Sequence, residues 1–326
     1  MIALVTGGAG FIGSNLVKKL LSEGVKVDIV DDLSSGSTEN LSGFKLREIH
    51  AGMASLDRPV PDDVINFYVG DFTSDAVLEK IATKKYDVIF HLAAVPRVSY
   101  SVEFPTLTTE ANLMKSVALF EVAAKSGTRV VASSSSSVYG GADVMPTPES
   151  EPRDPKSPYA LQKSVMEDFG RLFSKLYGFD VVFLRYFNVF GPNQRDGSAY
   201  ATAITAWCSA IKNNRALRSD GDGSQTRDMC YVDNVVSANY LAGIREEKFV
   251  GQAYNVCCGD SVSNAEILEH FRTRFSGIDI KNAPWRPGDV MHTLGDWSAA
   301  KRDLGYEPLV RFWDGLNRTI AWWELE

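Results

Sequence analysis

The amino-terminal segment combines an apolar strand with three regularly spaced glycines. Residues 2–6 read Ile-Ala-Leu-Val-Thr, the pattern of a buried parallel strand, and Gly7, Gly10 and Gly13 follow directly. The first glycine allows a tight turn, the second lets a pyrophosphate approach the backbone, and the third lets the next helix pack close to the strand. That helix points unpaired N–H groups at the phosphates. The segment therefore predicts a parallel sheet that binds a dinucleotide.

Two acidic residues end the second apolar strand. Residues 25–30 form this strand, and Asp31 and Asp32 follow it. A carboxylate at this distance from the glycines accepts hydrogen bonds from an adenosine ribose diol and repels a 2′-phosphate. No arginine follows closely. We therefore expect NAD rather than NADP, while a solvated loop acid is the alternative interpretation, more so for Asp32 than for Asp31.

Strands and helices alternate along the first half of the chain. Strand patterns recur at 64–69 and 87–94, and helical patterns cover 106–125 and 159–177. Residues 34–63 are rich in Ser, Gly, Pro and Asp, so they are expected to form a long connection with little core. The alternation predicts an α/β fold with a doubly wound parallel sheet.

Polar residues also occur at a strand end, inside a strand and on a helix face. Asp71 and Phe72 follow the strand at 64–69 and are expected to lie along the adenine. His91 lies inside an apolar strand, which favours a hydrogen-bonded core histidine over a ligand. Asn112 is a polar residue on a largely apolar helix face.

A serine-rich strand end precedes a tyrosine and a lysine that are four residues apart. The strand ends in Ser133 to Ser137, and Tyr159 and Lys163 follow after a proline-rich loop. Positions i and i+4 share one face of a helix, so the phenol and the amine can meet. A free tyrosine has a pKa of about 10, and a neighbouring ammonium favours its ionised form. We expect Tyr159 to act as an acid/base on an alcohol proton, with a strand hydroxyl orienting the same oxygen.

Composition limits the class of protein. The formal net charge of −7 and the pI near 5.3 give no basic footprint, so no nucleic-acid partner is expected. No apolar run approaches the roughly 18 residues of a membrane span, and the glycine motif begins too early for a cleaved signal peptide. We expect a cytoplasmic protein with no membrane partner. The four cysteines and four histidines lack metal-ligand spacing, so reduced packing thiols and no metal are expected.

Motifs along nearly the whole chain resemble those of one enzyme family. In chain order they are TGGAGFIGSNL, DDLSSG, HLAA, SSSSSVYG, SPYALQKS, LRYFNVFGP, GDGSQTRDMCYV, YNVCCG and RPGDV. In number and order they resemble the extended short-chain dehydrogenases/reductases, and among these the nucleotide-sugar 4-epimerases. The resemblance implies a Rossmann-like fold with a smaller carboxy-terminal substrate lobe, NAD as cofactor, a UDP-sugar substrate and a homodimer.

The resemblance also implies roles for individual residues. The catalytic set is Ser135, Tyr159 and Lys163. The residues expected around NAD, from the motifs and the resemblance together, are Gly7, Gly10, Phe11, Ile12, Gly13, Asp31, Asp32, Asp71, Phe72, Leu92, Ala93, Ala94, Asn112, Lys163 and Tyr186. Those expected at the substrate are Ser137, Asn188, Arg227, Arg286 and Thr293. Asn188 and the two arginines are expected to bind the diphosphate, with a surface salt bridge as the alternative for either arginine.

Related families share the tyrosine and the lysine but differ at the serine run. The 4,6-dehydratases need extra acids where this chain has Ser136 and Ser137, and UDP-glucuronate decarboxylases carry a glutamate at the position of Ser137. Neutral hydroxyls favour reversible oxidation at C4 and epimerisation through a 4-keto sugar. A dehydratase or reductase is the enzymatic alternative. An NAD-sensing scaffold is the non-enzymatic one, although it would be expected to lose Tyr159 or Lys163.

One residue bears on the size of the sugar. In the family, the residue seven positions after the arginine of the Arg-Pro-Gly-Asp motif lines the sugar pocket, and a tyrosine there accompanies specificity for glucose and galactose. This chain has the smaller Thr293. We therefore expect UDP-GlcNAc/UDP-GalNAc interconversion, with UDP-Glc/UDP-Gal possible as well.

The domain boundaries follow from where the alternation loosens. Residues 1–186, joined by 228–257, are expected to form the NAD-binding domain, and 187–227 with 258–326 the nucleotide-sugar lobe, with the substrate between them. Wide apolar arcs on the two long helical segments fit a helix-pair homodimer, and packing on the chain's own sheet would also account for them.

Overall fold

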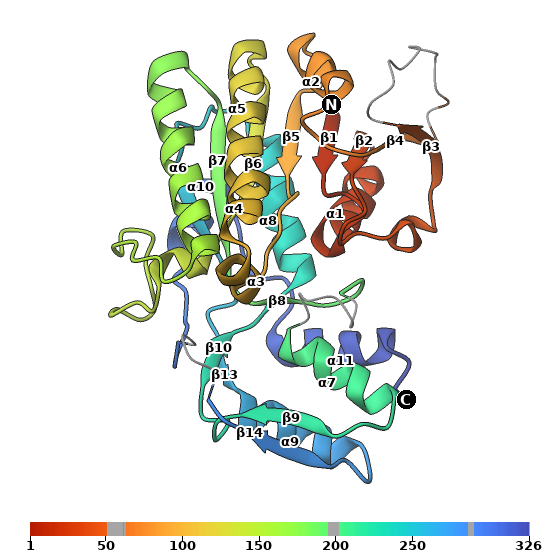
Figure 1. Ribbon diagram of the computed structural model, residues 1–326, viewed down its shortest axis with the longest axis vertical. Coiled ribbons are helices and arrows are strands. Elements are labelled where there is room, and N and C mark those ends of the chain that lie inside the picture. Colours follow the sequence, from red (N-terminus) through yellow and green to blue (C-terminus); the bar gives the residue numbers. More distant parts are fainter. Residues whose placement is uncertain (51–60, 62, 195–201, 286–289, 326) are drawn as a thin grey trace.

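The computed structural model describes all residues except 51–60, 62, 195–201, 286–289 and 326. A larger α/β part contains the amino terminus, and a smaller lobe with the carboxy terminus lies at one end of it (Figure 1). This arrangement confirms the predicted fold class.

An eight-stranded sheet forms the centre of the larger part, in the order β12-β7-β6-β5-β1-β2-β4-β3. Every neighbouring pair is parallel, so the carboxyl ends of all eight strands meet at one edge. The strands are β1 (Ile2–Thr6), β2 (Lys26–Asp31), β3 (Lys45–His50), β4 (Val64–Val69), β5 (Val88–His91), β6 (Arg129–Ser135), β7 (Val181–Tyr186) and β12 (Ala253–Val256). The strand order reverses between β1 and β5, and a crevice for a ligand opens at such a reversal.

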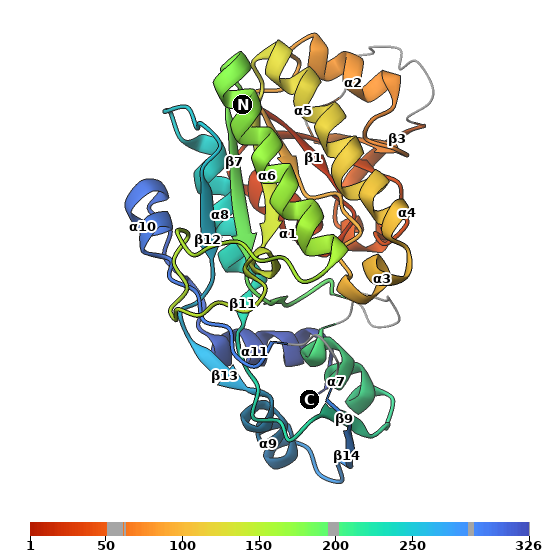
Figure 2. The same ribbon diagram turned by 60° about the vertical axis from the view of Figure 1, so that its left-hand side comes forward.

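Helices cover both faces of this sheet (Figure 2). On β1, Ala3 and Val5 pack on one side and Leu4 on the other, because successive strand residues point to opposite faces. The first side is covered by α1 (Phe11–Ser22) and α8 (Val232–Ile244), and the second by α2 (Asp75–Ala82), α5 (Lys115–Ser126) and α6 (Pro158–Tyr177). Gly178, in the left-handed region at φ +67°, ends α6 as its position predicts.

Two predictions about local structure were wrong. The connection predicted for residues 34–63 contains β3, which pairs along its full length with β4 at the edge of the sheet. Its charged residues Lys45, Arg47 and Glu48 hide the strand pattern, because an edge strand buries little of its surface. The sequence Tyr231-Val232-Asp233 at the start of a helical pattern also predicts Asp233 as an N-cap residue, but Tyr231 is the N-cap residue of α8 and Asp233 lies inside the first turn.

Among the described residues, three two-stranded sheets lie outside the central one. In the smaller lobe, β9 pairs with β14 and β10 with β13, while β8 pairs with β11 near the junction (Figures 1 and 2). The elements of the whole described chain that have not yet been given are α3 (Val98–Glu103), α4 (Pro105–Thr109), β8 (Val189–Phe190), α7 (Ala203–Lys212), β9 (Leu217–Asp220), β10 (Thr226–Asp228), β11 (Cys230–Tyr231), β13 (Ser261–Ser263), α9 (Asn264–Arg274), β14 (Ile280–Ala283), α10 (Ser298–Leu304) and α11 (Phe312–Trp322). Short 3-10 turns occur at Thr38–Leu41 and Ser136–Tyr139, and a π-helical turn at Glu110–Met114. Within the described ranges, none of the helices has the length and apolar character needed to cross a bilayer.

Candidate active site

A cavity of about 620 Å³ lies at the carboxyl edge of the sheet and is closed on its far side by the smaller lobe. Its lining comes from the ends of β1, β2, β5 and β6, from the start of α6 and from β10. The predicted site residues that line it are Gly7, Gly10, Phe11, Ile12, Gly13, Asp31, Asp32, Asp71, Phe72, Leu92, Ala93, Ala94, Ser135, Ser137, Tyr159, Lys163, Tyr186, Asn188, Arg227 and Thr293. One cavity thus brings together residues from both halves of the chain.

The glycine turn leaves no room for side chains. Gly7 adopts φ +71°, and a Cβ there would lie 2.8 Å from the amide nitrogen of Ala93. A Cβ on Gly13 would lie 2.1 Å from the carbonyl oxygen of Gly7. Gly10 is the N-cap residue of α1, and no side chain caps the helix there. The first N–H groups of α1 therefore remain available to an anion in the cavity.

The two acids after β2 differ in their surroundings. The buried carboxylate of Asp31 accepts hydrogen bonds from the backbone N–H groups of Ala9 and Leu33, both at 2.9 Å. Burial raises the pKa of Asp31, and these N–H groups oppose the rise. Asp32 instead accepts hydrogen bonds from the backbone and hydroxyl of exposed Ser34. Asp31 is thus held against the glycine turn, whereas Asp32 stabilises its own loop.

Residues near the ends of β4 and β5 form the next part of the wall. Asp71 pairs with Lys115 at 2.6 Å, and although partial burial opposes it, this pair keeps the pKa of Asp71 below its ordinary value. Asn112 is buried behind the lining rather than in it. Its side chain accepts a hydrogen bond from the N–H of Val95 and donates to the carbonyl oxygen of Val95 and to Gln162. Asn112 therefore shapes the cavity wall through the backbone.

His91 is a core histidine, as its place in an apolar strand predicts. Its Nδ1 lies 2.9 Å from the hydroxyl of Thr6 and its Nε2 lies 2.8 Å from the hydroxyl of Ser116. Burial lowers the pKa of His91 to about 3, so the imidazole is neutral at physiological pH.

Tyr159 and Ser135 meet where β6 ends and α6 begins. Ser157 caps α6 by accepting from the N–H of Ala160, and Pro158 occupies the first turn, so the phenol projects from the helix start. Tyr159 is buried, and the side chain of Ser135 is close enough to its phenol to lower the pKa of that phenol. This pairing puts a hydroxyl beside the phenol, as the sequence pattern predicts.

Lys163 lies one turn further along α6 and is 2 % exposed. Its ammonium donates to the carbonyl oxygen of Ser133 at 2.7 Å and to the hydroxyl of Ser133 at 3.2 Å. That this ammonium favours the phenolate of Tyr159 stays a prediction. In the chain alone, burial raises the pKa of Tyr159 to about 12, because the phenolate would lose its water, and the side chain of Ser135 offsets only part of the rise.

The serine run ends in a hydroxyl without a protein partner. Ser137 lines the cavity, and its hydroxyl oxygen is buried with no hydrogen bond among the described residues. Nearby, Tyr186 exchanges hydrogen bonds with Asn239, and burial raises the pKa of its phenol. A buried hydroxyl without a partner in a polar wall is suited to binding a ligand oxygen.

The far wall comes from the smaller lobe. Asn188, at φ +27°, donates from its side-chain amide to the hydroxyl of Thr293 at 3.2 Å and to the carbonyl oxygen of Asp228 at 3.1 Å. The guanidinium of Arg227 donates to the carbonyl oxygens of Thr226 and Met291. Arg286, the other arginine predicted at the diphosphate, lies outside the described residues.

Asp228 holds this wall together and was not predicted. Its buried carboxylate accepts hydrogen bonds from the N–H groups of Cys258, Gly259 and Gly295. Burial raises the pKa of Asp228 to about 6. The residue follows Arg227 directly, and its position next to a strongly polar segment gives no local signal that it is buried.

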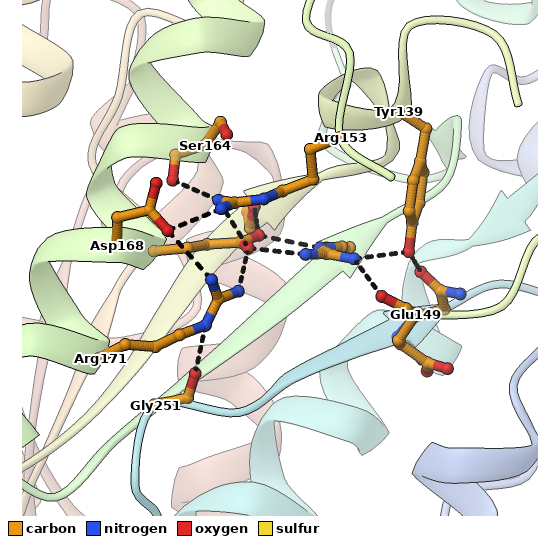
Figure 3. A network of polar contacts seen from close by, with 11 residues as sticks. Tyr139, Glu149, Arg153, Ser164, Asp168, Arg171 and Gly251 are labelled. Carbon is orange, nitrogen blue, oxygen red and sulfur yellow. Dashed lines mark hydrogen bonds and ion pairs between the residues drawn. The ribbon is translucent and has the colours of Figure 1, made fainter. Parts of the chain in front are cut away.

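A buried ionic network behind the serine strand was also missed (Figure 3). At its centre, Glu167 on α6 forms two hydrogen bonds with the guanidinium of Arg185, at 2.9 and 2.7 Å. Arg153 and Arg171 complete the set. A sequence signal existed, because Glu167 follows Lys163 by four residues and therefore shares the buried face of α6.

Comparisons with known proteins identify similar chains across the full length. Residues 3–257 match the model of a family described as NAD dependent epimerase/dehydratase. A UDP-glucose 4-epimerase of Mycolicibacterium smegmatis is 36 % identical over 323 residues, which are 98 % of this chain and 97 % of that protein.

Two solved structures are similar in both sequence and fold. A UDP-N-acetylglucosamine 4-epimerase from Methanobrevibacter ruminantium, in complex with UDP-N-acetylmuramic acid, is 37 % identical with a TM-score of 0.86, covering 99 % of this chain and 97 % of that one. A dTDP-glucose 4,6-dehydratase from Streptomyces venezuelae, with NAD bound, is 29 % identical with a TM-score of 0.84, covering 99 % of this chain and 97 % of that one.

Proposed function

The chain belongs to the NAD dependent epimerase/dehydratase family, and from this premise we propose that it is an NAD-dependent UDP-sugar 4-epimerase. The observation that carries the proposal is that Tyr159, Ser135 and Lys163 line the same cavity as the glycine turn. An acid/base group and a dinucleotide site in one cavity are what reversible oxidation of an alcohol requires.

The described residues fit NAD. Gly7 and Gly13 have no space for a Cβ, α1 begins without a side-chain cap, and Asp31 ends β2 beside the turn. Bound NAD supplies a hydride acceptor and donor for the sugar carbon and, when oxidised, a positive charge in the site. Asp31 would accept from the ribose diol, and the N–H groups of α1 would bind the pyrophosphate.

Tyr159 accepts the proton of the sugar 4-hydroxyl and later returns it. Ser135, whose side chain lies beside the phenol, orients the sugar oxygen. A phenol with a pKa of about 12 needs positive charge nearby to act as a base at neutral pH, and the ammonium of Lys163 is the cation that the chain provides.

The nucleotide holds the sugar while it changes face. Asn188 and Arg227 line the lobe side of the cavity. We propose that they bind the diphosphate, together with Arg286, which the resemblance assigns to it. A 4-keto sugar tethered in this way can rotate and present its opposite face. Release of the keto sugar is prevented because the nucleotide carries most of the binding contacts.

We assign UDP-GlcNAc/UDP-GalNAc as the preferred pair. Thr293 lines the cavity, is fixed by its hydrogen bonds with Asn188 and the N–H of Asp228, and is small enough to leave space for an N-acetyl group. UDP-glucose and UDP-galactose are smaller and would also enter.

Dehydration of the sugar is the second candidate, since one similar structure is that of a 4,6-dehydratase. Ser136 and Ser137 argue against it, because eliminating water requires an acid that protonates the leaving hydroxyl. Mass spectrometry of the product decides the case. Epimerisation keeps the mass of the substrate, and a product lighter by one water would reject the proposal.

We propose a homodimer formed through the α5 and α6 side of the sheet. Leu161, Leu172 and Leu176 on α6 are 53 %, 48 % and 60 % exposed, and Met114 beside α5 is 54 % exposed. Light scattering of the purified protein measures the mass that tests this.

The four cysteines are free, which supports the expected location in a reducing cytoplasm.

A further inference from the structure

Glu167 lies one turn after Lys163 on α6 and is a fully buried residue, 0 % exposed. Oε1 accepts from the hydroxyl of Ser134 at 2.7 Å and from Nε of Arg185 at 2.9 Å, and Oε2 accepts from Nη2 of Arg185 at 2.7 Å. Burial alone would raise the pKa of Glu167, but the guanidinium of Arg185 holds it below its ordinary value. Glu167 is therefore ionised at neutral pH.

The cations around Glu167 come from three segments. Arg185 belongs to β7, Arg171 to α6 and Arg153 to the loop before α6. From Oε2 of Glu167, Nη2 of Arg171 is 2.9 Å away and Nη1 of Arg153 is 3.6 Å away. Asp168 shares Arg153 and Arg171 from the exposed side of the helix (Figure 3). Among the described residues, no hydrogen bond joins Asp168 to Ser134 or Arg185. Glu167 and Asp168 are thus neighbours that differ in whether they reach the serine strand.

Ser134 connects this network to the active site. It lies on β6 between Ser133, which accepts from Lys163, and Ser135, whose side chain lies beside the phenol of Tyr159. The bond from Ser134 to Glu167 therefore fixes the strand at its middle residue, while the two catalytic side chains of α6 contact the residues on either side. One helix and one strand are joined at three successive serines.

Glu167 lies one turn after Lys163 on the same buried face of α6, so its negative charge is near the ammonium. Burial lowers the pKa of Lys163 to about 8, and the negative charge of Glu167 opposes that fall. The other titratable groups next to Lys163 are Tyr159, one turn earlier on α6, and neutral His91 on β5. If the amine gave up its proton more readily, it would lose the charge that favours the phenolate, so the tyrosine would stay protonated.

We propose that Glu167 is a positioning residue that keeps Lys163 in its ammonium form and holds the serine strand in register with α6. Its effect on turnover rests on the function proposed above. Its effect on Lys163 does not, because the charge of a lysine is measurable without substrate.

The first test titrates Lys163 directly. In protein labelled with ¹³C at lysine Cε, the Lys163 resonance is assigned by its absence in Lys163→Arg, and its midpoint is followed by NMR against pH. We expect Glu167→Gln to lower the midpoint by about one pH unit, because a nearby opposite charge is removed. Asp168→Asn is the matched control and should leave the midpoint in place. A folded Glu167→Gln protein with an unchanged midpoint would overturn the proposal.

The second test keeps every charge and is expected to preserve the fold. Ser134→Ala removes the hydrogen bond to Glu167 alone, so the Lys163 midpoint should stay while kcat falls about tenfold with KM unchanged. Full kcat in Ser134→Ala would overturn the positional part of the proposal. If the unmodified protein epimerises no UDP-sugar, the proposed function fails, and the NMR titration still decides the role of Glu167.

Discussion

The ammonium of Lys163 is anchored to the strand rather than to the phenol, with 2.7 Å between its Nζ and the carbonyl oxygen of Ser133. Tyr159, one turn earlier, has the side chain of Ser135 beside its phenol instead. The two side chains of the Tyr-x-x-x-Lys pair therefore face the same strand two residues apart. We expect Lys163 to influence Tyr159 through its charge and through this strand.

Replacing Lys163 by methionine should remove the charge and keep most of the packing. We expect Lys163→Met to fold, because the buried stem is replaced by an unbranched apolar chain, and to lose at least about 100-fold in kcat, because the phenolate loses its cation. Lys175→Met, in the exposed last turn of the same helix, is the control. Steady-state kinetics of both variants checks the difference, and equal kcat in the two would argue against any role for the ammonium.

Asp31 and Asp32 offer a matched pair for the cofactor site. Asp31→Ala should lower NAD affinity about 10- to 100-fold, since the carboxylate beside the glycine turn is lost. Asp32→Ala should bind NAD as the unmodified protein does, because Asp32 mainly stabilises its own turn with Ser34. Calorimetric titration of NAD into both proteins measures this, and a larger loss in Asp32→Ala would reverse the assignment.

His91 should make folding stability depend on pH. In the unfolded chain its pKa is near 6.5, whereas burial lowers it to about 3 in the folded protein, so only the unfolded chain takes up this proton between the two values. The free energy of unfolding should therefore fall as pH drops below about 6.5, by up to about 1.4 kcal/mol per pH unit from this residue. Urea unfolding at pH 7 and pH 5 should show a shallower pH dependence in His91→Gln. The same slope in both proteins would mean that other groups cause it.

Thr293 should control which sugars enter. Thr293→Tyr fills part of the cavity, so we expect kcat/KM for UDP-GlcNAc to fall about 10- to 100-fold while UDP-glucose is affected less. Thr293→Ser retains the hydroxyl that accepts from Asn188 and should keep both activities. Competition between the two sugars in one reaction measures the ratio of their kcat/KM values. An unchanged ratio in Thr293→Tyr would show that this residue does not set the sugar preference.

Local patterns were enough to predict much of the fold. The strand-glycine-helix segment and the end of α6 at Gly178 depend on nearby residues, so their sequence signals survive without tertiary information. The edge strand β3 was missed because its exposed charges resemble those of a loop. The α/β sheet and NAD as the cofactor are confirmed. The role of each residue that lines the cavity stays a prediction.

Side chains whose partners come from distant segments could not be predicted in the same way. Asn112 was expected at NAD, yet it binds the backbone of Val95, 17 positions earlier in the chain. The spacing of Glu167 from Lys163 places it on the buried face of α6, but the sequence does not show that β6 and β7 bring Ser134 and Arg185 to it. In both cases the local sequence gives the polar group but not the tertiary contact that determines its role.

The most direct measurement is incubation of the purified protein and of Tyr159→Phe with UDP-GlcNAc and no added cofactor, followed by separation of the sugar isomers. We expect the unmodified protein to form UDP-GalNAc of unchanged mass. We expect the variant to lose turnover while its fold and NAD content stay intact. Full epimerase activity in Tyr159→Phe would contradict this account.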